Sequence, residues 1–63
     1  MADVTKGPSN RLSFQDAIEV WRRYRSGEYQ NRIAAAFDVN QGRVNEVIKG
    51  KLHPGSEREA FTA

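Results

Sequence analysis

The chain has 63 residues, no cysteine and a formal net charge of +2, with 29% of its residues charged. This length allows one domain, which buries only about 60% of the surface that its unfolded form exposes. The lack of cysteine excludes disulfides and thiolate metal sites, and no apolar run approaches the roughly 20 residues that cross a bilayer. The N-terminus has no basic patch followed by an apolar signal core. We therefore expect a cytoplasmic protein without a cofactor and without a membrane partner.

Residues 1–11 show no hydrophobic period and contain the breakers Gly7 and Pro8, which favours a flexible N-terminal arm. Lys6 and Arg11 would allow this arm to reach a minor groove, as some N-terminal arms do. The alternative is an arm that is simply disordered.

The first helix is predicted over 14–26. Ser13 and Asp16 match a variant of the capping box, and Gly27 fits a left-handed position just beyond the helix end. An apolar stripe recurs every three to four residues and consists of Phe14, Ala17, Ile18, Trp21 and Tyr24. As the largest apolar side chain, Trp21 is expected at the centre of the core.

Two shorter helices are predicted over 29–37 and 41–49. The first has one apolar face, made of Ile33, Ala34 and Phe37, and the second has another, made of Val44, Val47 and Ile48. Asp38-Val39-Asn40 interrupts the first period, so it forms a tight turn, and the Asn40 side chain is expected to cap the next helix. Gly50 suits the residue after its end. Two amphipathic helices joined by three residues form a helix-turn-helix unit.

The remaining residues predict a turn followed by a short helix over 57–61. His53-Pro54-Gly55 forms the turn, and Ser56 with Glu59 matches another capping box. Phe61 either folds back on the bundle or packs against a second copy. The whole chain is thus expected to be all-α, with an arm (1–11), a three-helix helix-turn-helix domain (12–52) and a C-terminal turn with a short helix or tail (53–63).

Residues 30–51 resemble the helix-turn-helix of small bacterial and phage DNA-binding transcriptional regulators. That pattern has an alanine in the first of its two helices, an apolar residue in the turn and two apolar anchors in the second, recognition helix. In this chain Ala34 is the alanine, Val39 is the turn residue, and Val44 and Val47 are the anchors. The turn usually carries glycine where this chain has Asp38. Because that site commonly needs a positive φ, which aspartate tolerates better than most residues, the departure has a small energetic cost.

The charges are segregated along the sequence. Residues 22–51 include seven basic and three acidic residues, and the acidic residues at the two ends of the chain offset this excess. A basic centre favours a polyanionic partner. The simpler alternative is an ordinary solvated surface, since the charged fraction is close to average.

The resemblance implies a recognition helix whose N-terminal part lies against base edges in the major groove. By residue type, Gln41 and Asn45 suit adenine, Arg43 suits guanine, and Glu46 can accept from cytosine. Glu46 has an alternative role as an ion-pair partner of Arg43 or Lys49. Gly42 either provides a flat spot for DNA or is a tolerated defect near the helix start.

Phosphate contacts are expected at both edges of this surface, from Tyr29, Asn31, Arg32, Lys49 and Lys51. Tight specific binding commonly needs two half-sites, so a homodimer on DNA is one expectation.

The main rival is a protein-interaction adaptor that uses the same fold to bind a polymerase subunit or another transcription-machinery protein. Exposure of Tyr24, Tyr29 or Phe61 would favour it. RNA binding is a weaker alternative, because no aromatic-bearing sheet is predicted. We expect no enzyme, since the chain has no nucleophile–base pair and no metal cluster and is too short to build a catalytic pocket.

Overall fold

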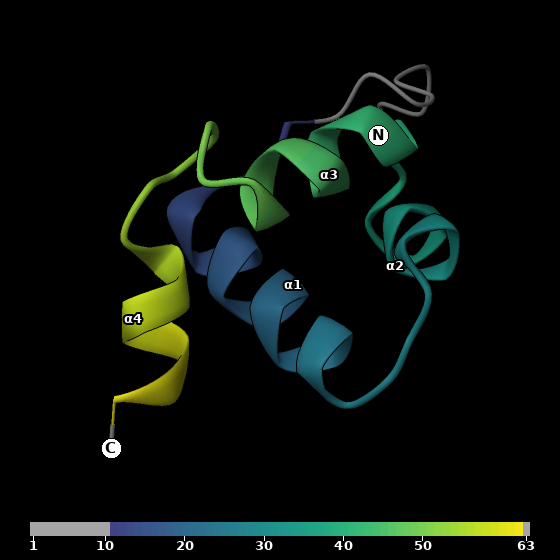
Figure 1. Ribbon diagram of the computed structural model, residues 1–63. Coiled ribbons are helices and arrows are strands. Elements are labelled where there is room, and N and C mark those ends of the chain that lie inside the picture. Colours follow the sequence, from purple (N-terminus) through teal and green to yellow (C-terminus); the bar gives the residue numbers. More distant parts are fainter. Residues whose placement is uncertain (1–10, 63) are drawn as a thin grey trace, which may run out of the picture.

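The computed structural model describes residues 11–62, and this range contains four helices joined by turns (Figure 1). They are α1 (Phe14–Arg25), α2 (Gln30–Phe37), α3 (Gln41–Ile48) and α4 (Ser56–Phe61), and this range contains no strand. The all-α prediction is confirmed, and each helix limit lies within one residue of its predicted position. None of these helices is long and apolar enough to cross a membrane. Residues 1–10, on which the predicted arm depends, lie outside the described range; Arg11 is exposed.

Local signals define both ends of α1. The Ser13 hydroxyl accepts from the Asp16 amide, and the Asp16 carboxylate accepts from the Ser13 amide, each at 3.0 Å, which confirms the capping box. After the helix, Gly27 has a φ of 106°, as expected beyond a helix end. The buried stripe differs from the predicted one, because it includes Val20 whereas Phe14 and Tyr24, near the two ends of the helix, are exposed.

The connection between α2 and α3 depends on an unusual backbone conformation. Asp38 has a φ of 58° and a ψ of 47°, which confirms the predicted positive φ in this turn. The left-handed residue ends α2, and the Val39 amide then donates to the Ala34 carbonyl at 3.0 Å. Val39 is buried as a result. The predicted Asn40 side-chain cap is wrong: this side chain is exposed and makes no cap hydrogen bond, and exposed first-turn amides are open to water.

The core lies where α1, α2 and α3 meet. Ala17, Val20, Ile33 and Val44 are completely buried at its centre, and Ala34 is buried beside them. Trp21 is also buried, with 7% of its surface exposed, but it lies toward the margin of the core, in edge-to-face contact with Tyr24 and Phe61. The expectation that Trp21 forms the centre is therefore corrected, because other side chains are more completely buried and Trp21 packs against two rings that are themselves exposed.

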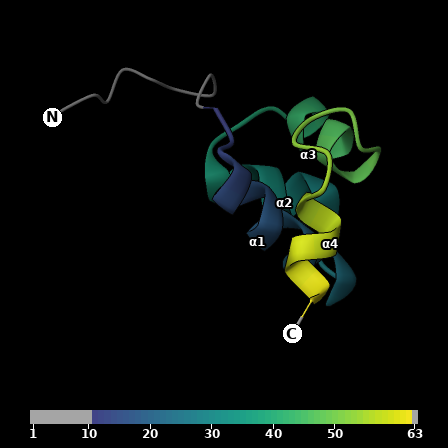
Figure 2. The same ribbon diagram turned by 90° about the vertical axis from the view of Figure 1, so that its left-hand side faces the viewer.

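The fourth helix packs along α1, as Figures 1 and 2 both show. Ala60 is buried against the core, and the Phe61 ring lies 6.4 Å from the Trp21 ring. Phe61 thus folds back on the bundle, one of the two predicted alternatives. The Ser56–Glu59 capping box is wrong: Gly55, with a φ of 97°, is the N-cap residue, and Ser56 is the first residue of the helix, with its side chain turned inward.

A histidine in the turn after α3 contacts the segment that precedes α1. His53 Nε2 donates to the Leu12 carbonyl at 2.6 Å, and the His53 ring meets Phe14 edge to face. Leu12 is itself buried in the core. The segment before α1 is therefore fixed to the turn that follows α3.

Candidate nucleic-acid interface

The α3 helix is divided into an inner and an outer face. Val44 and Val47 are buried, and Ile48 is half-buried against the core. The outer face carries exposed Gln41, Gly42, Arg43 and Lys49. Because apolar positions spaced by three and four residues hold the helix down, the residues between them are left on the surface.

Arg43 and Glu46 are paired on this outer face. Their Nη1 and Oε1 atoms are 3.1 Å apart, one helical turn from each other, and the two side chains are 57% and 42% exposed. Such an exposed pair stabilises a helix by only about 0.2–0.5 kcal/mol, so it can open at little cost. Of the two roles predicted for Glu46, the free protein has the ion pair, with Arg43 rather than with Lys49.

Asn45 lies at the junction of α3 with α2 and is half-buried. Its side-chain amide donates to Gln30 Oε1 at 3.4 Å, a contact between residues fifteen positions apart. This amide nitrogen is therefore already bonded in the free protein, which the sequence did not indicate. Gln30 was missed because only the crossing of the two helices brings it to α3.

Gly42 has open space around it. Apart from its chain neighbours and the backbone of its own helix, a Cβ atom built on this glycine would meet no atom within 4 Å. The packing of the described chain therefore does not require a glycine here, and the φ of Gly42 is not in the left-handed region. Both predicted explanations, a flat spot for DNA and a tolerated defect, remain consistent with this geometry.

The residues predicted to contact phosphates are all on the surface. Tyr29 is the N-cap of α2 and is 73% exposed, and Asn31 and Arg32 in the first turn are exposed as well. Lys49 caps the C-terminus of α3, and Lys51 follows in the exposed turn. These side chains come from the first turn of α2 and from the end of α3.

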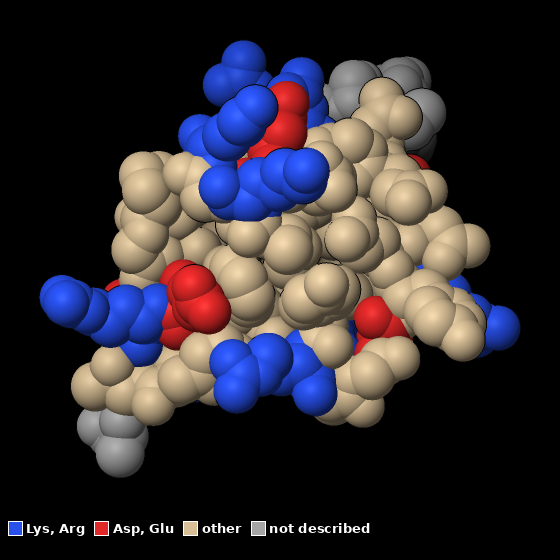
Figure 3. Space-filling model, in the orientation of Figure 1, with Lys and Arg blue, Asp and Glu red and all other residues tan. Residues whose placement is uncertain are grey.

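The basic centre predicted from the sequence separates into two surfaces. In Figure 3, Lys and Arg atoms gather over α3 and the turn after it, with acidic atoms among them. Two arginines of α1 contact groups outside this surface. Arg23 forms ion pairs with Glu19 and Glu28, at 3.6 and 3.3 Å, and Arg25 lies over the Phe61 ring, 4.4 Å from its centroid. The excess of positive charge near α3 is thus smaller than the sequence count implies.

Comparisons of the chain with protein-family models, with curated proteins and with solved structures found no match. The candidate site therefore rests on the residues and geometry described above.

Proposed function

We propose that this chain is a helix-turn-helix domain that binds double-stranded DNA sequence-specifically and regulates transcription in the cytoplasm. In this proposal α2, the turn at Asp38 and α3 form the helix-turn-helix unit, and α3 is the recognition helix in the major groove. Neither catalysis nor a cofactor is part of the proposed role.

One observation carries the proposal: α3 buries Val44 and Val47 and leaves Gln41, Gly42 and Arg43, in its first turn, exposed. Residues near the N-terminus of a recognition helix are those that meet base edges. Arginine and glutamine there have the hydrogen-bonding groups that match guanine and adenine. Lys49, Lys51 and Arg32 supply positive charge for the phosphates on either side.

The test is fluorescence anisotropy with a labelled random-sequence duplex at several salt concentrations. If about five phosphates are neutralised, log K should fall with log salt with a slope of about −4 to −5. A slope near zero, or no binding at low salt, would contradict the proposal. Selection from a random duplex library would then identify the preferred site, and half-sites spaced by one helical turn would indicate a homodimer on DNA.

A second candidate, a protein-interaction adaptor, is favoured by a different surface. Phe61 is 43% exposed and Tyr24 is 37% exposed, and both contact the Trp21 ring at the ends of α1 and α4 away from α3. Exposed aromatic residues are common at protein interfaces. If Tyr24→Ala abolished capture of an RNA polymerase subunit while duplex binding was absent in the parent chain, the adaptor would replace the DNA-binding role.

A further inference from the structure

The hydrogen bond between Gln30 and Asn45 connects the two parts of the candidate nucleic-acid interface. Gln30 is the first residue of α2 and lies between Tyr29 and Asn31, which are predicted to contact phosphates. Asn45 belongs to α3 and is predicted to read a base. Its Nδ2 atom donates to Gln30 Oε1 at 3.4 Å, and both residues are half-buried. Gln30 thus contacts a predicted base-reading side chain without belonging to the recognition helix.

Helical spacing places Gln30 on the face of α2 that meets α3. Ile33 and Ala34, three and four residues further along α2, are buried, so Gln30 continues their row at the start of the helix. On the other helix, Asn45 comes three residues before Ile48, which packs against the core. The two amides therefore meet at the rim of the contact between the helices. A hydrogen bond is stronger there than in open solvent, because the local dielectric constant is lower.

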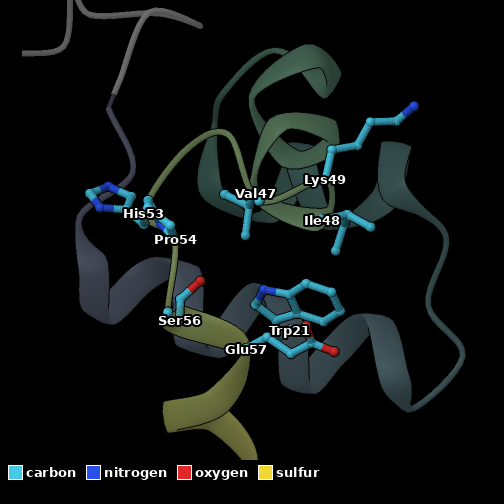
Figure 4. Close-up of a pocket in the computed structure, with 10 residues that line it drawn as sticks. Trp21, Val47, Ile48, Lys49, His53, Pro54, Ser56 and Glu57 are labelled. Carbon is cyan, nitrogen blue, oxygen red and sulfur yellow. The ribbon is translucent and has the colours of Figure 1, made fainter.

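The packing of α3 determines where the helix lies, but not which way the Asn45 amide is turned. In Figure 4 the side chains of Val47 and Ile48 point from α3 toward Trp21 of α1, whereas Lys49 points away. These apolar contacts hold the helix from its inner side. The last torsion of an asparagine side chain is broad, and its oxygen and nitrogen ends differ little in shape. A hydrogen-bonding partner is therefore what distinguishes the two orientations of the amide.

We propose that Gln30 is a positioning residue for DNA recognition, whose side-chain oxygen orients the Asn45 amide so that it pairs with adenine. This role rests on the proposed function, because it requires α3 to lie in the major groove. An asparagine amide pairs with adenine N6 and N7 through its oxygen and one N–H. The second N–H is not needed for this pair, so it is available to Gln30 Oε1. A reversed Asn45 amide would bring its oxygen against the Gln30 oxygen, and two acceptors form no hydrogen bond.

The experiment compares the base preference of the parent chain with those of Gln30→Met and Gln30→Glu. The probes are the duplex selected from the random library and its single-base variants, and Asn45→Ala identifies the base position that Asn45 reads. Gln30→Met keeps the length of the side chain but removes the acceptor. The preference for adenine at that position should therefore fall by about 2–10-fold, the range expected for one hydrogen bond. Gln30→Glu keeps an acceptor and should retain the preference, although its negative charge lowers the affinity for every duplex alike.

A matched control and a measurement without DNA complete the test. Gln15→Met makes the same chemical change at an exposed position of α1, so it should alter neither the affinity nor the base preference. In the ¹⁵N NMR spectrum of the free chain, Gln30→Met should shift the side-chain NH₂ signals of Asn45, whereas Gln15→Met should leave them in place.

Failure of the proposed function and failure of the positioning role give different results. A parent chain that selects no duplex would refute the proposed function, and the role of Gln30 with it. If the parent selects a duplex, the role of Gln30 alone would be overturned by an Asn45→Ala chain that relaxes no base position. The same conclusion would follow if Gln30→Met retained the adenine preference, lost affinity equally for all four bases, or left the Asn45 side-chain signals unchanged in the free chain.

Discussion

Arg43 and Glu46 form an ion pair on the outer face of α3, with Nη1 and Oε1 3.1 Å apart. The pair brings a carboxylate next to the one arginine of α3, the helix that we propose enters the major groove. In a groove flanked by phosphates, the positive charge of Arg43 is expected to raise the affinity for duplex DNA and the negative charge of Glu46 to lower it. Their substitution therefore tests the proposed function at the level of single charges.

Arg43→Ala should lower affinity for the selected duplex and relax preference at one base position, whereas Glu46→Gln should raise affinity for random duplex. A bidentate arginine–guanine pair discriminates by about 1–3 kcal/mol. Two unit charges about 4 Å apart in water interact by about 1 kcal/mol, so loss of the Glu46 charge corresponds to an increase of up to about fivefold. Anisotropy titrations with both duplexes measure the two effects.

Stability provides the control for both variants. Because the pair is exposed, each change should alter the free energy of unfolding by no more than about 0.5 kcal/mol. Arg58→Ala, on the exposed surface of α4, should leave binding almost unchanged. If Arg43→Ala preserved full selectivity, the predicted base-reading role of Arg43 would have to be abandoned.

Gly42→Ala separates the two explanations for this glycine. The added methyl group meets no neighbouring element or side chain within 4 Å outside its adjacent residues, so the helix should gain about 1 kcal/mol, a rise in Tm of about 4–8 °C for a domain of this size. If Gly42 provides a flat spot against DNA, duplex affinity should fall although the protein becomes more stable. Thermal unfolding by circular dichroism and duplex titration, on the same preparation, give the two numbers.

Higher stability with unchanged duplex affinity would mean that Gly42 is a tolerated defect in the helix. Ala36→Gly serves as the reverse control, since Ala36 is an exposed helical position outside the predicted interface. It should lower stability by about 1 kcal/mol without affecting DNA binding.

Asp38 tests the turn between α2 and α3. A β-branched residue is strongly disfavoured at a φ of 58°, so Asp38→Val should destabilise the domain by about 1–2 kcal/mol. Asp38→Gly should change stability much less, because relief of strain is offset by greater freedom of the unfolded chain. Urea unfolding of the three proteins gives the comparison, and equal stability of the valine and glycine variants would contradict it.

The helix limits could be predicted from the sequence because their signals are local. The Ser13–Asp16 box, Gly27 and the turn at Asp38 each act within a few residues: the box and Gly27 have the conformations that their residue types favour, and Asp38 has a left-handed one that aspartate tolerates. Ser56 shows where this reasoning fails: it matches a cap by spacing, but the left-handed Gly55 makes it the first residue of α4 and turns its side chain inward.

The features that were not predicted depend on how the helices cross. Val20 is completely buried although it is not part of the apolar stripe predicted from the sequence, and the Asn45–Gln30 contact exists only where α2 meets α3. The charge count along the sequence likewise could not show that Arg23 is paired with Glu19 and Glu28. The hydrophobic periodicity predicts which face of a helix is buried, but the neighbouring helix determines which side chains at the edge of that face are buried or form contacts.

An NMR titration of the ¹⁵N-labelled chain with duplex DNA identifies the surface that binds the duplex. If α3 is the recognition helix, the largest amide shifts should fall in residues 41–46, with smaller ones at residues 29–32, while the amide signals of Tyr24 and α4 should stay unchanged. Shifts concentrated on Tyr24, Phe61 and the rest of α4, or no shifts at any salt concentration, would contradict the proposal that α3 is a recognition helix.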